Sequence, residues 1–127
     1  MATEAVGVDV VDVARFALAL RRRPRLLERL FTPREREDAA GRPERLAARF
    51  AAKEAVLKTL GSGLGDAPFS SIEVQRRPSG APVIVLHDGA ADLARARGIT
   101  RLHVSLSHTA TLATAFVIGS SDVARAG

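Results

Sequence analysis

The amino-acid sequence predicts an α+β fold in which a small antiparallel sheet packs against a long helix. Three observations support this prediction. Residues 43–60 show helical spacing of apolar side chains and end at Gly61, the residue type that most often closes a helix. An alternating run at residues 72–76 and an apolar run at residues 83–86 flank a turn at residues 78–82, which predicts a β-hairpin. An alternating run at residues 102–107 and an apolar run at residues 112–118 predict two further strands.

Length and composition limit the possible classes of protein. The chain has 127 residues, about the size of one domain, so we expect a single domain over residues 1–119 and a polar, flexible tail over residues 120–127. An apolar content of 46% and a mean hydropathy of +0.06 are typical of soluble proteins. No apolar run approaches the ~20 residues of a membrane span. With no signal-peptide pattern and no cysteine, the expected compartment is the cytoplasm.

The charge of the chain predicts an anionic partner. The net charge is +5 and the pI is near 11.2, which favours binding to something acidic. Nucleic acid is one candidate, but the chain has no tryptophan and no tyrosine. Aromatic platforms on which single-stranded bases stack are therefore poorly supplied. An acidic protein or a polyphosphate ligand fits the charge at least as well.

The first expected element is a strand at residues 6–11, a run rich in β-branched side chains. Asp9 interrupts this run, and a carboxylate is costly to bury without a partner. Capping of the backbone is one explanation, but we favour a ligand role because Asp9 lies in the middle of the run. Asp12 is the better cap, since helical spacing begins directly after it, at residues 13–20.

A strongly basic segment follows. Six arginines lie within fifteen residues, with one acid among them: Arg15, Arg21, Arg22, Arg23, Arg25 and Arg29. Most charged runs are simply solvated, but this one is one-sided, which favours a docking surface for an acidic partner. Pro24 is expected to begin a short helix that carries Leu27, Leu30 and Phe31 inward.

A third helix is predicted over residues 33–40. Thr32 and Glu35 have the spacing of a capping box, with Pro33 at the first helical position. The side chains of this helix are polar on most faces. Residues 41–43, Gly-Arg-Pro, are expected to end it and to lead into the long helix.

The long helix carries the only two lysines of the chain. On a helical wheel, Lys53 lies near the middle of the apolar side, where it must reach outward or meet a partner. Glu54 and Lys58 lie together at the edge of that side. A functional pair of side chains is one interpretation, and an ordinary (i, i+4) ion pair on a solvated face is the other.

The second half of the chain is expected to be mostly β-structure. The glycine-rich loop at residues 61–65 is interpreted as a flexible connector, because it follows a helix C-terminus instead of preceding an N-terminus. Residues 72–76 alternate like a half-exposed strand and are expected to pair with residues 83–86. Asp88 is expected to cap a short helix at residues 90–97.

The last two strands carry the histidine of most interest. His103, Ser105 and Ser107 alternate on the polar face of the strand at residues 102–107. His108 ends that strand, where it is suited to contact a phosphate or to move a proton. His87 and His103 are expected to be surface or hydrogen-bonded residues.

Asp9 and Glu54 are the two acids expected against apolar surroundings. Mg²⁺ commonly binds one or two carboxylates together with waters and substrate phosphates, so this pair suits a magnesium site and not a closed zinc site. The residues alone therefore indicate an Mg²⁺-assisted phosphate enzyme with an acidic partner.

Three segments carry a family resemblance. Residues 7–16 contain Gly-Val-Asp-Val-Val-Asp and then Arg-Phe. Residues 49–65 contain Phe-Ala-Ala-Lys-Glu-Ala and the glycine-rich loop, and residues 104–109 are Val-Ser-Leu-Ser-His-Thr. Together, in this order and over nearly the whole chain, they resemble the holo-(acyl-carrier-protein) synthase family, the short single-domain 4′-phosphopantetheinyl transferases. The resemblance implies the fold of that family and its reaction: coenzyme A donates 4′-phosphopantetheine to a serine of an apo acyl or polyketide carrier protein, and adenosine 3′,5′-bisphosphate is released.

The resemblance also implies roles for single residues. Asp9 and Glu54 would hold Mg²⁺ with the pyrophosphate of coenzyme A, and Glu54, or a water that it positions, would help to deprotonate the serine. Lys58 would act in catalysis by stabilising charge on the bridging phosphate. His108 would act there too, as a contact to the phosphates. Further residues are assigned by the same resemblance: Arg49, Gly61 and Thr109 to the coenzyme A site, and Arg15 and Arg22 to the acidic carrier protein.

The same family is typically trimeric, which implies a homotrimer with active sites at subunit interfaces. We expect no nucleic-acid partner and no membrane partner. Two other functions stay open at this point. One is a non-catalytic module that binds the carrier protein without turnover, against which the intact Asp9, Glu54 and Lys58 argue. The other is nucleic-acid binding through the arginine surface, which rests on charge alone. Lys53 is expected to be structural or to line the ligand site.

Overall fold

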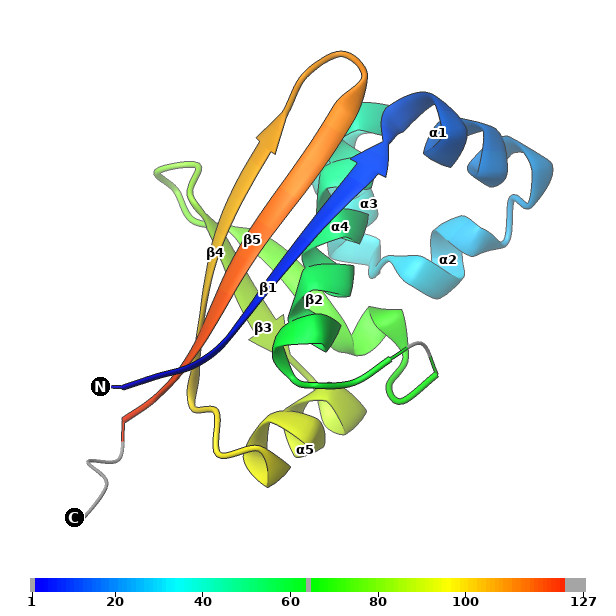
Figure 1. The fold of residues 1–127 in the computed structure, drawn as a ribbon. Coiled ribbons are helices and arrows are strands. Elements are labelled where there is room, and N and C mark those ends of the chain that lie inside the picture. The colour runs from blue at the N-terminus through cyan, green and yellow to red at the C-terminus, as the bar shows by residue number, and fades with distance from the viewer. Residues whose placement is uncertain (1, 64, 123–127) are drawn as a thin grey trace.

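The computed structural model describes residues 2–63 and 65–122, and its larger sheet has three antiparallel strands (Figure 1). They are β1 (Ala2–Asp12), β4 (Arg101–His108) and β5 (Leu112–Ser121), with β5 in the middle. The strands that the sequence predicts at these places are confirmed, and each is longer than predicted. The predicted α+β class is confirmed as well.

The long helix α4 (Pro43–Thr59) packs against the inner face of this sheet and lies behind β1 and β5 in Figure 1. Small and aliphatic side chains of α4 make up much of the core: Ala51, Ala52, Ala55, Val56 and Leu57 are buried. Gly7 of β1 permits this contact, because a Cβ at that position would overlap the carbonyl oxygen of Ala55. The strand therefore comes close enough to α4 for residues of both elements to share one site.

The opposite face of the sheet carries exposed apolar side chains. Val6, Val8 and Val10 of β1 are 56%, 51% and 61% exposed, because alternate residues of a strand point to opposite faces. Phe116 of β5 lies opposite Val8 in the register, and both Phe116 and Leu112 are 46% exposed. We call these five residues the apolar outer face.

Three short helices connect β1 to α4. In α1 (Val13–Arg22), Oδ1 of Asp12 accepts a hydrogen bond from the backbone N–H of Arg15, so the predicted cap is confirmed. The second helix, α2 (Leu26–Leu30), leads to the buried Phe31. The predicted capping box is present at the start of α3 (Pro33–Ala39).

A second, two-stranded sheet pairs β2 (Ile72–Arg76) with β3 (Pro82–Leu86), after the short 3-10 helix η1 (Phe69–Ser71). The hairpin is confirmed, but the prediction that β2 is half exposed is wrong for its first three residues, which are buried. Helices α3 and α4 both contact β2. The carboxylate of Glu73, one of these three residues, accepts hydrogen bonds from the side chains of Thr32 and Gln75.

Helix α5 (Asp88–Ala96) begins two residues earlier than predicted. His87, and not Asp88, is its N-cap, and no side chain caps the helix. The reason lies in the backbone, because the N–H groups of Ala90 and Ala91 already bond to the carbonyl oxygen of His87. Asp88 is instead the first helical residue, with a φ of +43°.

The end of the chain differs in part from the prediction. β5 continues to Ser121, and Ser120 and Ser121 are buried, so these two residues belong to the sheet and not to a polar tail. The rest of the expected tail, from residue 123, lies outside the described residues. Among the residues that the structure describes, no helix is both long enough and apolar enough to cross a membrane. The cytoplasmic location stays a prediction.

Candidate active site

An open pocket lies where β1, α1 and α4 meet, with a volume of about 430 Å³. We call it the acidic pocket, and its lining consists of Asp9, Val10, Val11, Asp12, Arg15, Phe16, Phe50 and Glu54. Asp9 reaches it from the inner face of β1, and Glu54 reaches it from α4. Two carboxylates from elements far apart in the sequence thus share one cavity, as a two-carboxylate site requires.

The negative charge of Asp9 acts on Glu54 within this pocket. Partial burial raises the pKa of Glu54, the negative charge of Asp9 raises it further, and the positive charge of Lys58 lowers it. A carboxylate with a raised pKa binds a proton or a cation more readily than an ordinary glutamate does. The pocket is therefore suited to accept positive charge.

Lys58 supplies one such charge from the edge of the pocket. Its Nζ donates hydrogen bonds to the carbonyl oxygen of Val8, at 2.9 Å, and to Oδ1 of Asp9, at 3.1 Å. The Lys58 side chain is 52% exposed, so it keeps freedom to move. The alternative of a simple ion pair with Glu54 is not realised in the described part of the chain, because the ammonium group contacts Asp9 instead.

Aromatic rings form one wall of the acidic pocket. The ring centroids of Phe16 and Phe50 lie 4.9 Å apart, and those of Phe50 and Phe69 lie 5.5 Å apart. The first pair is tilted and the second is stacked, and contacts between aromatic rings of this kind are stabilising. Phe16 and Phe50 line the acidic pocket together with Glu54, so one part of its lining is apolar.

A second cavity, of about 290 Å³, lies on the other side of α4. We call it the basic pocket, and it is lined by Arg45, Ala48, Arg49, Val74, Arg76, Gly80, Pro82, Leu106 and His108. Arg49 and His108, which the sequence assigns to the coenzyme A site, therefore lie together. Sequence reasoning missed Arg45 and Arg76, although Arg45 precedes Arg49 by one helical turn and could have been found by that spacing.

Arg49 indicates that the basic pocket binds an anion. Its side chain is buried, its Nη1 donates to the carbonyl oxygen of Arg45 at 3.3 Å, and its Nε has no partner among the described residues. Burial lowers the pKa of Arg49, and the charge of Glu35 raises it in part. A buried guanidinium with an unused donor is costly, and an anionic ligand in the pocket would remove that cost.

The remaining predicted site residues lie apart from these pockets. Gly61 follows α4, where Arg97 approaches its carbonyl oxygen at 3.5 Å. Thr109 lies in the turn between β4 and β5, and its hydroxyl accepts hydrogen bonds from the N–H groups of Thr111 and Leu112. Arg22 is exposed at the end of α1. A single chain does not bring all of the predicted residues to one place.

The acidic pocket fits a hard divalent cation. Asp9 and Glu54 offer carboxylate oxygens. Burial and the negative charge of Asp9 make the ionised form of Glu54 less favourable, so a cation bound nearby would stabilise that form. Within residues 2–63 and 65–122, no group of three or more histidine, cysteine, aspartate or glutamate side chains could enclose a metal ion. Two carboxylates in an open pocket suit Mg²⁺, which keeps waters and substrate oxygens among its ligands.

Comparisons with known proteins agree with this geometry. The sequence profile of the 4′-phosphopantetheinyl transferase superfamily matches residues 5–115. The chain is 51% identical over 117 residues to a holo-[acyl-carrier-protein] synthase of Clavibacter michiganensis, covering 92% of this chain and 95% of that protein. A holo-[acyl-carrier-protein] synthase of Moorella thermoacetica is 42% identical over 124 residues, covering 95% of this chain and 97% of that protein. The crystal structure of the Helicobacter pylori holo-[acyl-carrier-protein] synthase in complex with coenzyme A superposes with a TM-score of 0.82 at 32% identity. That match covers 91% of this chain and 99% of the other.

Proposed function

This chain belongs to the 4′-phosphopantetheinyl transferase superfamily, and from that premise we propose how its own residues transfer 4′-phosphopantetheine from coenzyme A to a serine of an apo acyl carrier protein. The second product is adenosine 3′,5′-bisphosphate. One observation carries the assignment of roles: Asp9 and Glu54, from β1 and α4, line the acidic pocket, and Lys58 forms an ion pair with Asp9.

We assign the proton transfer to Glu54. In the reaction, the serine oxygen forms a bond to the phosphorus that carries pantetheine, and the bond from that phosphorus to the bridging oxygen of the pyrophosphate breaks. The serine proton passes to Glu54, or to a water that Glu54 positions. Its raised pKa suits Glu54 to this task, because a carboxylate of ordinary pKa is a weaker base.

Lys58 supports the leaving group. Negative charge develops on the bridging oxygen as the bond breaks, and a positive charge placed there stabilises the transition state. The ammonium group of Lys58 is half exposed on a flexible stem, so it can turn from Asp9 toward the substrate. Lys53 is unable to take this role, because it is fully buried.

Asp9 and Glu54 are the residues that would hold Mg²⁺. When bound there, Mg²⁺ would offset the negative charge of the pyrophosphate of coenzyme A. Asp9 contributes a carboxylate that is 17% exposed and bonded to Lys58 in this structure. In this proposal Asp9 also holds the Lys58 ammonium group beside the acidic pocket until the substrate binds.

The basic pocket is the proposed site for the phosphates at the adenosine end of coenzyme A. Arg49 offers its unpaired Nε, and Arg45, Arg76 and His108 line the same cavity. Planar guanidinium groups bind phosphate oxygens through two parallel hydrogen bonds. His108 is therefore a phosphate contact in this proposal, together with Arg49.

We further propose a homotrimer with active sites across subunit boundaries. The acidic and basic pockets lie on opposite sides of α4 within one chain, so a neighbouring subunit would have to bring its basic pocket to the acidic pocket of the first. The apolar outer face supports this assembly, because exposed apolar patches of this kind mark contacts between proteins.

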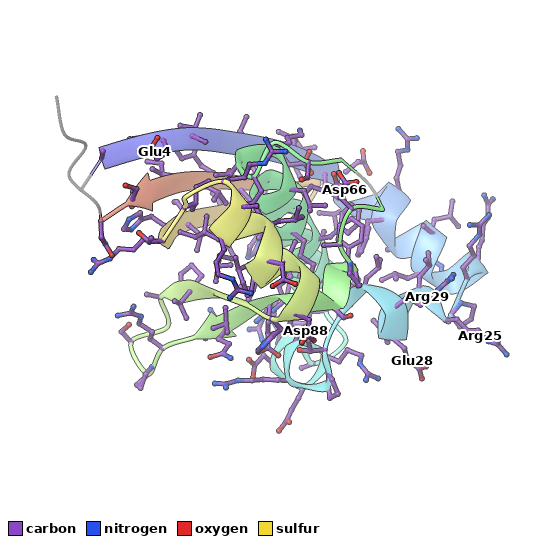
Figure 2. The ribbon with its side chains drawn as sticks, turned by 90° about the horizontal axis from the view of Figure 1, so that it is seen from below. Glu4, Arg25, Glu28, Arg29, Asp66 and Asp88 are labelled. Carbon is purple, nitrogen blue, oxygen red and sulfur yellow. The ribbon has the colours of Figure 1, made fainter. Side chains whose placement is uncertain are left out.

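An acidic surface of the carrier protein is the proposed partner of the basic segment at residues 15–29. Arg15 lines the acidic pocket and Arg22 is exposed on the same helix. Figure 2 shows Arg25 and Arg29 projecting from the far end of the molecule, with Glu28 beside them. Opposite charges would guide the carrier protein so that its serine approaches the acidic pocket.

A mass-gain assay tests the proposed chemistry. Incubation of the enzyme with coenzyme A, Mg²⁺ and an apo carrier protein is expected to add the mass of 4′-phosphopantetheine. Glu54→Ala is expected to slow this step at least about hundredfold, the usual effect of losing a general base, with unchanged circular dichroism. Glu37→Ala, which removes an exposed acid on α3, is the matched control and should react normally. Modification by Glu54→Ala at the rate of the unmodified enzyme would overturn the mechanism.

A further inference from the structure

Two charged side chains lie in the interior, away from both pockets. Glu35 of α3 and Lys53 of α4 are 0% exposed, and Nζ of Lys53 lies 2.7 Å from Oε1 of Glu35. Transfer of two charges out of water is expensive, and apolar residues of similar volume often replace a buried ion pair with no loss of stability. Stability alone therefore does not account for this pair.

The hydrogen bonds of the pair join three elements. Besides Glu35, Nζ of Lys53 donates to the carbonyl oxygens of Phe69, at 2.9 Å, and of Ile72. Oε1 of Glu35 also accepts from the N–H of Thr32 at 3.0 Å, and Oε2 accepts from the N–H of Val74 at 2.9 Å. All three ammonium protons and both carboxylate oxygens are thus in use. The pair ties α3 and α4 to the segment that runs from η1 into β2.

The hydrogen bonds of this pair reach a residue that lines the basic pocket. Val74, whose N–H bonds to Glu35, lines that pocket together with Arg76, two residues further along β2. On the facing wall, Arg49 lies one helical turn before Lys53 on α4. The distance between these walls is therefore set by the bonds of Glu35 and Lys53. Glu35 also opposes the effect of burial on the charge of Arg49, because it raises the pKa that burial lowers.

We propose that Glu35 and Lys53 are positioning residues for coenzyme A, which hold β2 against α4 so that Arg49 and Arg76 stand at the separation that the phosphates require. This inference rests on the proposed use of the basic pocket. The pair would affect the binding of coenzyme A. It would affect neither the chemical step nor the binding of the carrier protein.

The double variant Glu35→Leu/Lys53→Met tests this assignment, because it removes both charges and leaves apolar side chains of similar size. We expect a folded protein whose KM for coenzyme A rises about tenfold, since displacements of about 1 Å at a binding site have effects of this order or larger. Both kcat and the KM for the carrier protein should stay within about threefold of the unmodified enzyme, because the acidic pocket is unchanged.

The control is Arg101→Gln/Asp122→Asn, which removes an exposed ion pair with an N–O distance of 3.1 Å. It should leave the KM for coenzyme A unchanged. Calorimetric titration with coenzyme A should report the same loss of affinity in the positioning variant as the kinetics do. If the pair were merely structural, its removal would change thermal stability but neither the KM for coenzyme A nor the affinity for coenzyme A measured by calorimetry.

A second variant keeps the test decisive should the double variant unfold. Glu35→Gln/Lys53→Met also removes both charges but keeps one side-chain acceptor oxygen at position 35, and it should raise the KM for coenzyme A at least about threefold with little change in kcat. An unchanged KM for coenzyme A in either folded variant overturns the positioning role. Failure of the proposed function itself is distinct, because the unmodified enzyme would then neither bind coenzyme A nor modify the carrier protein.

Discussion

Lys53 and Lys58 lie on the same helix, five residues apart, and each forms an ion pair with a carboxylate from another element. Lys53 and its partner Glu35 are both 0% exposed. Lys58 is 52% exposed, and its partner Asp9 is 17% exposed. The two pairs therefore have similar chemistry in very different surroundings.

The difference explains why only one of the two lysines is suited to catalysis. The ammonium group of Lys53 donates to three fixed acceptors, so none of its protons can reach a substrate. Lys58 donates to two acceptors at the edge of an open pocket and can exchange them for a phosphate oxygen. A buried pair holds structure in place, whereas a half-exposed pair keeps a charge available.

The largest expected effect is the loss of stability in Lys53→Met. This change leaves the Glu35 carboxylate buried without its cation, which typically costs about 3–5 kcal/mol of unfolding free energy. Urea unfolding at pH 7, followed by circular dichroism, measures the loss. The double variant Glu35→Leu/Lys53→Met should recover most of it. A single variant as stable as the unmodified protein would mean that Glu35 is not held as an ion in the interior.

Lys58→Met should show the opposite pattern, with a small effect on stability and a large effect on rate. Exposed ion pairs contribute at most about 1 kcal/mol, so the urea midpoint should move little. Loss of a charge that stabilises the transition state slows reactions by roughly 10²–10³-fold, and mass spectrometry of the carrier protein would measure this. Lys58→Arg, which keeps the charge in a different shape, is the matched control and should recover part of the rate. A normal transfer rate in Lys58→Met would remove Lys58 from the mechanism.

Much of the fold could be predicted because its signals are local. Asp12, Thr32 and the turn between β2 and β3 specify their elements within a few residues. Helix phase alone indicated that Lys53 points to the apolar side. Its partner could not be predicted, because Glu35 lies 18 residues away on a helix whose side chains are polar on most faces. Only the three-dimensional structure shows that the face of α3 that carries Glu35 is buried.

The candidate site was predictable to a similar degree. The resemblance to a known family named Asp9, Glu54 and Lys58. Asp9 and Glu54 do line one pocket, and Lys58 contacts Asp9. It did not indicate that Lys58 contacts Asp9, since the (i, i+4) rule considers a single helix. Arg76 was missed because arginine is so frequent in this chain that it does not stand out, whereas Arg45 could have been found by its spacing of one helical turn from Arg49.

The smallest expected effect concerns Glu73, which borders the buried pair. Burial alone would raise the pKa of Glu73, but hydrogen bonds from Thr32, Gln75 and His87 outweigh it, so the pKa lies below the ordinary glutamate value. The unfolded state therefore binds a proton at higher pH than the folded state does. Stability from Glu73 is fully present above about pH 4.3, the usual pKa of glutamate, and is lost as the pH falls toward the lowered pKa of the folded state.

Glu73→Gln should abolish this pH dependence. At pH 7 we expect the variant to be less stable by about 1.5–3 kcal/mol, the usual contribution of hydrogen bonds to a charged group, and the difference should shrink as the pH falls from 5 to 3. Urea unfolding at several pH values measures it, with Glu28→Gln as the exposed control, labelled on α2 in Figure 2. A difference that stays constant down to pH 3 would show that the charge of Glu73 contributes nothing to stability.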